Sequence, residues 1–320
     1  MILAGDVGGT KSNIGLFDVR DGHLARVAHK RYSSHEHAGL QEITKDFLQE
    51  NPANITAASF GVAGPVVNNR VYGTNMPWIV DGATEAAFLG LNRVRILNDL
   101  EATAFGVGVL PPEDLALLYE GVPVEQATRV VIAAGTGLGE AVLFWDGKQH
   151  LAMGTEGGHA DFAPHTPQQA DLWKHLRGRN DYVSAEILLS GRGFKNVHEF
   201  LDPTVKHPGF DEPGKDVAPL ITQQGLSGEC PVCDATLNLW TEIYGSEAGN
   251  FAIRALARGG VYVAGGIAVK VLPKLKDGRF VAAARDKEKM KDFLATVPIY
   301  VVLNEECPLI GAAYVAWKGL

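Results

Sequence analysis

Acidic side chains beside glycine turns are the first feature of this chain that is suited to chemistry. The stretch Gly5-Asp6-Val7-Gly8-Gly9-Thr10 follows apolar Ile2-Leu3-Ala4. This order predicts a buried strand, a tight hairpin at the glycine pair, where glycine permits positive φ, and a second strand over residues 11–18. The turn could aim backbone N–H groups, helped by Thr10, at a bound phosphate. Asp6 could hold hydrated Mg²⁺ beside that phosphate. Taken alone, the stretch would more simply be an ordinary hairpin.

Asn98-Asp99 follows Val94-Arg95-Ile96-Leu97, a stretch that predicts another strand. Functional groups of open α/β sheets lie at the carboxyl ends of strands. Asp99 could therefore accept the proton of a hydroxyl that attacks a phosphate, while Asn98 could bond a neighbouring hydroxyl. Aspartate is also a preferred helix N-cap. Taken alone, Asp99 is better predicted to cap the helix that begins at Leu100, and it could do both.

Two further glycine turns recur downstream. Gly135-Thr136-Gly137-Leu138-Gly139 separates predicted strands over residues 129–134 and 140–145. Because a strand and not a helix follows, a Rossmann dinucleotide site is disfavoured. The likeness to residues 1–18 indicates two similar hairpins, one per domain, that hold one polyphosphate. Gly265-Gly266, after a predicted buried strand, would let a base or ribose lie against the backbone, or would allow close packing of a helix.

Hydroxyl-binding groups follow the second turn. Glu156 and His159 stand among glycines in residues 153–164. Such a loop suits a polar ligand site, and the alternative is a solvated surface loop. Glu186 lies in the first turn of a helix predicted to start at Ser184, where it could be an exposed acid favoured by the helix dipole or could point into a binding site.

Cys230-Pro231-Val232-Cys233 has the spacing of a metal or redox motif. Only Cys307 remains elsewhere among three cysteines, so a four-cysteine zinc site is excluded. A redox role lacks a neighbouring βαβ pattern. We therefore interpret the pair as ordinary thiols at the start of a helix.

The composition limits the class of protein. The chain has 320 residues, 46% of them hydrophobic, and a net charge of −8. This length allows two domains with separate cores. The negative charge gives no support for a nucleic-acid or membrane-surface partner, and no apolar run is long enough to span a bilayer. The absence of a basic signal region and the three cysteines predict a cytoplasmic location.

Hairpins and alternating helices and strands must position these groups. A third strand near residues 24–32 completes a meander, and helices are predicted over 37–50, 83–90, 234–257 and 308–317. Further buried strands are predicted near 55–62 and 299–303. Residues 198–228 are polar and rich in proline and glycine, which indicates loops around short helices.

The order of these motifs resembles the actin–hexokinase–Hsp70 superfamily and, within it, bacterial glucokinases that lack a zinc motif. The resemblance rests on seven segments: Gly5–Thr10, Leu97–Asp99, Ala134–Gly139, Glu156–Pro164, Ser184–Glu186, Leu189–Gly191 and Val263–Ile267. It implies an α/β fold of two ribonuclease-H-like domains with an interdomain cleft, ATP on the larger domain and glucose deep in the cleft. The expected domains are residues 1–108 with a C-terminal helix at 304–320, and residues 109–303. The related repressor-and-kinase family has a cysteine-rich zinc motif soon after its Gly-His, and no cysteine stands between His159 and Cys230.

The resemblance also implies roles. Asp99 corresponds to the base for the sugar 6-hydroxyl, and the sugar-binding residues are Asn75, Asn98, Asp99, Glu156, His159 and Glu186. The cofactor-binding residues are Gly5, Asp6, Val7, Gly8, Gly9, Thr10, Gly135, Thr136, Gly137, Gly265 and Gly266, with Mg²⁺ held through water at Asp6 and adenosine at the last two glycines. A homodimer is expected. Alternatives are a kinase for mannose, fructose or an N-acetylated hexosamine, and a sugar-sensing regulator on the same fold, which the lack of a DNA-binding segment disfavours.

Overall fold

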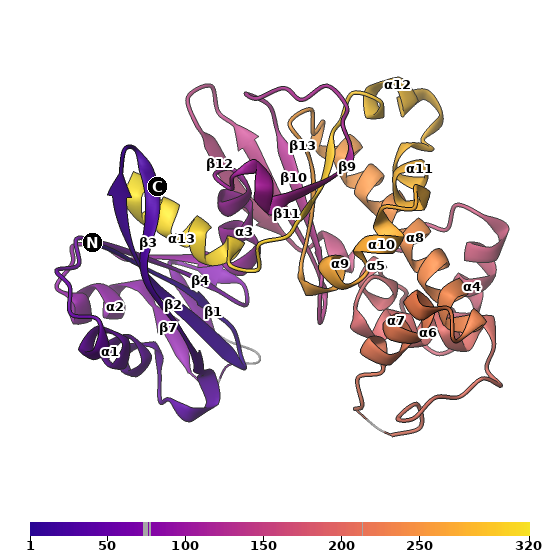
Figure 1. The fold of residues 1–320 in the computed structure, drawn as a ribbon, viewed down its shortest axis with the longest axis horizontal. Coiled ribbons are helices and arrows are strands. Elements are labelled where there is room, and N and C mark those ends of the chain that lie inside the picture. Colours follow the sequence, from indigo (N-terminus) through magenta and orange to yellow (C-terminus); the bar gives the residue numbers. More distant parts are fainter. Residues whose placement is uncertain (73–75, 77, 213) are drawn as a thin grey trace. The chain divides into compact units, whose positions relative to one another are not determined.

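The computed structural model describes residues 1–72, 76, 78–212 and 214–320 (Figure 1). The chain divides into two compact units. Unit 1 comprises residues 1–112, 150–154 and 304–320, and unit 2 comprises residues 113–149 and 155–303. The C-terminal segment thus returns to the N-terminal unit.

A five-stranded sheet forms the centre of unit 1, in the order β3-β2-β1-β4-β8. Strand β1 is antiparallel to β2 and parallel to β4, and β4 is parallel to β8. We call the β1–β2 pair hairpin 1. The bounds are β1 Ile2–Val7, β2 Lys11–Arg20, β3 His23–Ser33, β4 Ala57–Val62 and β8 Arg95–Asn98.

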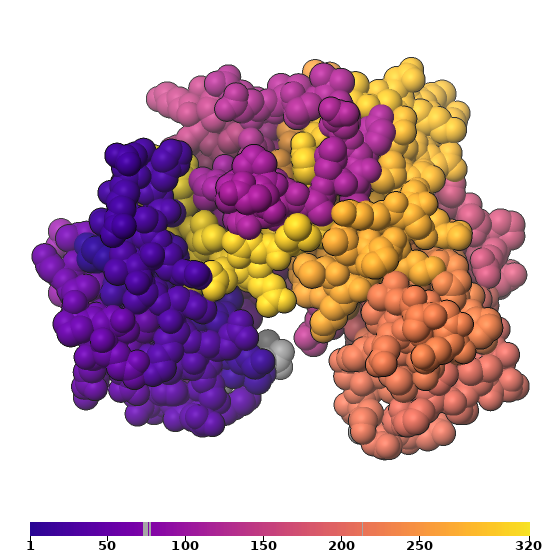
Figure 2. Space-filling model, in the orientation of Figure 1, coloured from indigo at the N-terminus to yellow at the C-terminus, as the bar shows by residue number. Residues whose placement is uncertain are grey.

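Alternating side chains of β1 bury both faces of this sheet. Leu3 and Val7 share a core with Phe47 of α1, while Ile2 and Ala4 pack with the C-terminal helix α13. Figure 2 shows yellow C-terminal atoms beside the indigo N-terminal strands. The remaining elements of unit 1 are η1 Ser34–Glu36, α1 Leu40–Glu50, β5 Val66–Val67, β6 Arg70–Tyr72, β7 Ile79–Asp81, α2 Gly82–Leu89, α3 Asp99–Val107 and α13 Cys307–Lys318.

Unit 2 repeats this strand pattern. Its sheet contains the order β11-β10-β13-β14-β9, with β10 antiparallel to β11 and parallel to β13. We call the β10–β11 pair hairpin 2. The bounds are β9 Leu115–Tyr119, β10 Arg129–Ala134, β11 Leu138–Trp145, β13 Gly260–Ala264 and β14 Ile299–Val302. Strand β12, His150–Thr155, belongs to unit 1 except for its last residue.

The long helix α8 organises the helical part of unit 2. It packs against α6, α7 and α11. Gly245 and Gly249 allow the backbone of α11 to approach, since a Cβ would lie 2.2 Å and 2.1 Å from the Phe280 and Ala284 carbonyl oxygens. The bounds are η2 Pro112–Asp114, η3 Gly157–His159, α4 Pro167–Arg177, α5 Ala185–Leu188, α6 Gly191–Leu201, α7 Ala218–Ser227, α8 Pro231–Ala255, α9 Gly266–Lys270, α10 Leu272–Leu275, α11 Arg279–Arg285, η4 Glu288–Met290 and α12 Lys291–Leu294.

Two local expectations differ from the structure. Gly8 lies in the turn of hairpin 1, where its N–H donates to the Lys11 carbonyl at 3.0 Å, but its φ is not positive. A four-residue turn closes this hairpin without the left-handed conformation. Helix α1 begins at Leu40 and not at His37, because the polypeptide first forms the short η1 turn and caps α1 at Gly39. Among the described residues, no helix has the length and apolar character that crossing a membrane requires.

Candidate active site

Asp6 lies near the end of β1, directly beside the turn of hairpin 1. Its cross-strand partner is Asn13, whose Nδ2 donates to Asp6 Oδ2 at 3.0 Å. Burial raises the pKa of Asp6, while the Asn13 bond and the positive charge of Arg31 lower it to a smaller extent. The strand pairing therefore supplies a partly buried carboxylate with one neutral amide donor, a position where a cation would relieve the cost of desolvation.

Asn98, and not Asp99, caps helix α3. The Asn98 Oδ1 accepts from the backbone N–H groups of Leu100 at 2.9 Å and Glu101 at 3.4 Å, and its Nδ2 donates to the Gly64 carbonyl at 3.0 Å. The prediction that Asp99 is the cap is wrong. Strand β8 runs through Asn98, so the capping position falls one residue earlier and Asp99 becomes the first helical residue.

In this arrangement the Asp99 Oδ1 accepts from the backbone N–H of Leu100 at 3.0 Å. Burial raises the pKa of Asp99 to about 6, and the negative charge of Asp6 adds to this increase. A carboxylate with a pKa near neutrality is both largely ionised at pH 7 and able to hold a proton, which is what a general base requires.

The Glu186 carboxylate lies against the glycine turn of hairpin 2. Its Oε2 accepts from the Leu138 N–H at 3.2 Å and occupies the space beside Gly137, where a Cβ would be 2.5 Å away. Its Oε1 accepts from Arg192 at 2.8 Å. Helix α5 thus brings an acid to the turn, and α6 brings a cation to that acid.

The other turn glycines are open to a ligand. A Cβ at Gly135 or at Gly266 would meet no described atom within 4 Å. Gly265 differs, because it takes a φ of 87° and its Cβ would lie 2.5 Å from the Ala134 carbonyl oxygen. Gly265 therefore serves close packing of the backbone, whereas Gly266 leaves space for a ligand.

Glu156 is the N-cap of the short turn η3, and His159 is the last residue of that turn. Their Oε2 and Nε2 atoms are 3.7 Å apart, and their side chains are 78% and 62% exposed. The intervening glycines permit this turn to rest on β11, since a Cβ at Gly157 would lie 2.0 Å from Glu140 Oε2 and one at Gly158 would lie 2.1 Å from the Leu138 carbonyl oxygen. Asn75, the remaining predicted sugar-binding residue, lies outside the described residues.

Comparisons with known proteins agree on one family. A family model described as Glucokinase matches residues 3–318. The chain belongs to the glucokinase family. A curated glucokinase from Nostoc sp. (strain PCC 7120 / SAG 25.82 / UTEX 2576) is 34% identical over 99% of this chain and 98% of its own length. A glucokinase of known structure from an Antarctic psychrotroph is 30% identical, with a TM-score of 0.89 over 99% of this chain and 98% of its own.

A more distant relative supports the fold. A ROK-family glucokinase from Streptomyces griseus, solved with glucose and AMPPNP, is 18% identical with a TM-score of 0.68 over 99% of each chain. Together these comparisons confirm the predicted enzyme, a glucokinase, and the predicted fold class, two ribonuclease-H-like domains of the actin-like ATPase type.

Three further residues lie beside the candidate site residues or the strand that leads to them, and the sequence analysis did not predict them. Gly61 of β4 lies between Gly5 and Asp99, because its Cβ would be 3.8 Å from the Gly5 carbonyl oxygen and 3.9 Å from the Asp99 Cα. Arg192 pairs with Glu186. Tyr244 of α8 donates to the Ile132 carbonyl at 3.1 Å and accepts from the Ala134 N–H at 3.2 Å, which fixes the strand that leads into hairpin 2. Of these three residues, only Gly61 could have been noticed in the sequence, as a glycine between the apolar residues Phe60 and Val62.

The residues of this glucokinase fit the groups that the reaction needs. The partly buried Asp6 carboxylate, which accepts from the neutral Asn13 amide, fits hydrated Mg²⁺. The open space at Gly135 and Gly266 fits a polyphosphate and nucleoside that approach the backbone.

Proposed function

We propose that this glucokinase transfers the γ-phosphoryl group of ATP to the 6-hydroxyl of glucose, with Asp99 as the general base. The observation that carries the proposal is the exchange of roles at the end of β8. Asn98 caps α3, so the Asp99 carboxylate, with its pKa raised to about 6, is free to accept a proton. The oxygen that loses this proton attacks phosphorus, and the bond to the β-phosphate oxygen breaks.

The residues proposed to bind the sugar carry groups that can bond hydroxyls. Glu156 and His159 provide an acceptor and an imidazole 3.7 Å apart, a spacing suited to two neighbouring ring hydroxyls. Glu186, Asn98 and Asn75 complete the proposed set. The bonds that Arg192 and Leu138 donate to Glu186 orient its carboxylate before sugar arrives, which lowers the entropic cost of binding.

The two hairpins hold the phosphates. The backbone of Gly5–Thr10 and of Gly135–Gly137 would donate to phosphate oxygens, and Gly266 would lie beside the adenosine. Asp6 would hold Mg²⁺ through water, and that ion would neutralise charge on the phosphates. In a site with fixed N–H donors and little water, this stabilisation is large because no reorganisation is needed during the reaction.

ADP release from Mg-ATP, measured with and without sugar, tests the proposal. We expect strong stimulation by glucose and weak stimulation by mannose, fructose and N-acetylglucosamine. Stimulation mainly by another sugar would retain the reaction and reject glucose as the substrate. Bound ATP without stimulation by any sugar would reject the kinase proposal and favour a sugar-sensing regulator.

Two further parts of the proposal concern the state of the enzyme. A cytoplasmic location is supported by the three buried cysteines, which form no disulfide among the described residues, as is usual for proteins of a reducing compartment. A homodimer is supported by the family resemblance, and light scattering after gel filtration should give twice the chain mass of 34.3 kDa. A mass equal to that of one chain would reject the dimer.

A further inference from the structure

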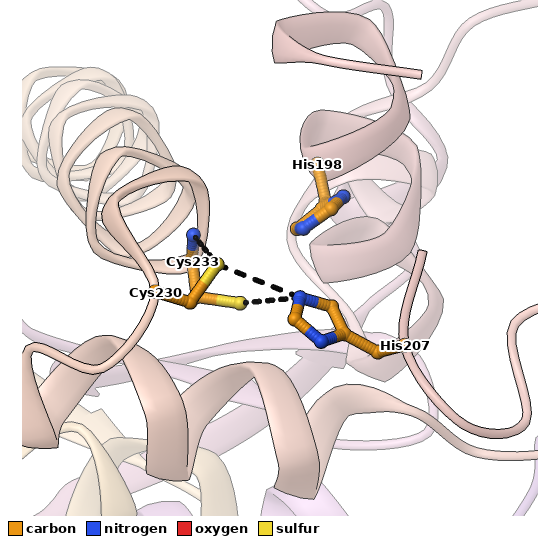
Figure 3. A group of neighbouring side chains, drawn as sticks. All are labelled: His198, His207, Cys230 and Cys233. Carbon is orange, nitrogen blue, oxygen red and sulfur yellow. Dashed lines mark hydrogen bonds between the residues drawn. The ribbon is translucent and has the colours of Figure 1, made fainter. Parts of the chain in front are cut away.

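Unit 2 contains a group of four potential metal ligands that the kinase reaction does not use: His198, His207, Cys230 and Cys233 (Figure 3). One ligand atom from each residue lies within 4.8 Å of the other three. His198 lies on α6, His207 lies between α6 and α7, and the two cysteines stand at the start of α8. Residues separated by up to 35 positions in the sequence (233 minus 198) thus place their ligand atoms close together.

The interior gives these groups few partners of their own. His198 and Cys233 are 0% exposed, and Cys230 is 8% exposed. Both ring nitrogens of His198 are buried without a hydrogen-bond partner among the described residues. A buried polar atom left unpaired costs about 1–3 kcal/mol. A histidine kept in this state calls for a ligand that is absent from the polypeptide itself.

The spacing of the atoms fits a tetrahedral ion. His207 Nε2 lies 3.5 Å from the Cys230 sulfur and 3.3 Å from the Cys233 sulfur. Zinc bonds of about 2.3 Å to sulfur and about 2.0–2.1 Å to nitrogen, at tetrahedral angles, place the two ligand atoms about 3.5 Å apart. Figure 3 shows the two sulfurs and the two imidazoles facing a common centre. Little movement is needed to place an ion there.

The start of α8 is also suited to thiolates. Cys230 is the N-cap, and its sulfur accepts from the Cys233 N–H at 3.3 Å. The positive end of a 25-residue helix favours negative charge at this position. Phe210 packs edge-on against both imidazoles, with ring centroids 4.9 Å and 5.3 Å away, and covers the cluster with an apolar surface.

We propose that His198, His207, Cys230 and Cys233 form a structural Zn²⁺ site. Two thiolates and two neutral imidazoles around Zn²⁺ make a neutral complex, which suits an apolar interior. Four protein ligands leave no open position, so the ion has a structural and not a catalytic role. The site ties α6 and the segment after it to the start of α8, within the helical part of unit 2 that Figure 2 draws in orange and salmon.

Metal analysis of the untagged full-length chain tests this proposal. After expression with zinc and gel filtration, mass spectrometry should find about one zinc per chain. Replacement by Co²⁺ should give thiolate-to-metal charge-transfer absorption and the intense ligand-field bands of a tetrahedral centre. A mercurial that titrates the thiols should release the zinc to a colorimetric chelator, and removal of zinc should lower the melting temperature.

Matched variants separate the site from general burial. Cys233→Ser and His198→Gln should each weaken zinc affinity by at least about a hundredfold, because a direct ligand contributes more than the outer-shell partners whose loss costs about 10–100-fold. His175→Gln should retain zinc, since His175 also has a buried ring nitrogen without a partner but lies outside the cluster. Cys307→Ser should also retain zinc, because that buried thiol donates to the Thr103 carbonyl.

Three results would overturn the proposal. The first is substoichiometric zinc in the native chain even after exposure to excess zinc. The second is a native mass two hydrogens lighter than the reduced chain, which would show a disulfide between Cys230 and Cys233. The third is an unchanged cobalt spectrum in Cys233→Ser or His198→Gln. The native-protein measurements decide the matter even if a variant fails to fold.

Discussion

The two glycine hairpins have the same framework but carry different groups. In both, the first strand is antiparallel to the second and parallel to the next strand in the sheet. One residue pair before the turn, hairpin 1 places Asp6 opposite Asn13, whereas hairpin 2 places Ala133 opposite Gly139. Hairpin 2 receives its acid from outside, as Glu186 of α5. With a shared backbone, hairpin 1 thus carries its acid on its own strand, whereas hairpin 2 receives its acid from a neighbouring helix.

One residue pair further from the turn, hairpin 2 carries the acid and hairpin 1 does not. Hairpin 1 has apolar Ile14 opposite Gly5, whereas hairpin 2 has Glu140 opposite Ile132. Glu140 is 1% exposed, and burial raises its pKa to about 7, with a further increase from the negative charge of Glu247. The comparison teaches that strand pairing fixes where a side chain lies, while the surrounding elements decide whether it is charged.

The largest effect should come from Asp99, the base beside hairpin 1. Asp99→Asn should retain glucose binding and lower kcat by roughly a thousandfold, because a positioned general base contributes about 10²–10⁴. The raised pKa of about 6 means that wild-type activity falls as the pH drops through 6, when Asp99 becomes protonated. Steady-state kinetics from pH 5 to 8 and calorimetry with glucose would measure both effects. Normal turnover of the variant would reject Asp99 as the base.

Glu140 tests whether hairpin 2 keeps a buried acid at a cost in stability. Its pKa rises from 4.5 unfolded to about 7 folded, so the proton favours folding at low pH and this contribution is lost as the pH rises from 4.5 through 7. Glu140→Gln should therefore raise the free energy of unfolding at pH 8 by up to about 3 kcal/mol, with little change at pH 4. Urea titrations at both pH values measure this. Glu125→Gln, at an exposed position, is the control, and equal gains at pH 4 and pH 8 would contradict the explanation.

Asp6 tests whether the charge of hairpin 1 serves a cation. Asp6→Asn should raise the Mg²⁺ concentration for half-maximal activity by about tenfold or more, since one carboxylate in an oxygen-ligand site is lost. Asp18→Asn, on the same hairpin but paired with Arg20 at the surface, should leave the Mg²⁺ requirement unchanged. If both variants or neither changed it, hairpin 1 would not be the metal-binding turn.

The smallest effect should come from the open glycines. Gly266→Ala should raise the KM for ATP by roughly tenfold, equivalent to about 1.4 kcal/mol, because a methyl group would fill space used by the nucleotide. The melting temperature should change little, since that methyl would meet no described protein atom within 4 Å. Gly39→Ala has the same free space and should leave the KM unchanged. A large fall in melting temperature for Gly266→Ala would show that the glycine serves packing instead.

Much of the fold could be predicted because its signals are local. The apolar run before Asp6 and the glycines after it predicted hairpin 1, and the same pattern near Gly135 predicted hairpin 2. Helical periodicity predicted α8 within a few residues at each end. The cap of α3 was mispredicted because Asn98 and Asp99 are both good capping residues, and only the length of β8 decides between them.

The sequence by itself determined the family, the order of strands and turns, and the residue types at each turn, because each depends on neighbouring positions. Only the tertiary structure decided which distant residues meet. It brought Glu186 to Gly137, and it joined His198 and His207 to the cysteine pair that had been interpreted as ordinary thiols. Counting cysteines could not reveal that cluster, since its histidines have no fixed spacing in sequence. The raised pKa values of Asp99 and Glu140 also arise from tertiary burial, because desolvation depends on everything packed around a group.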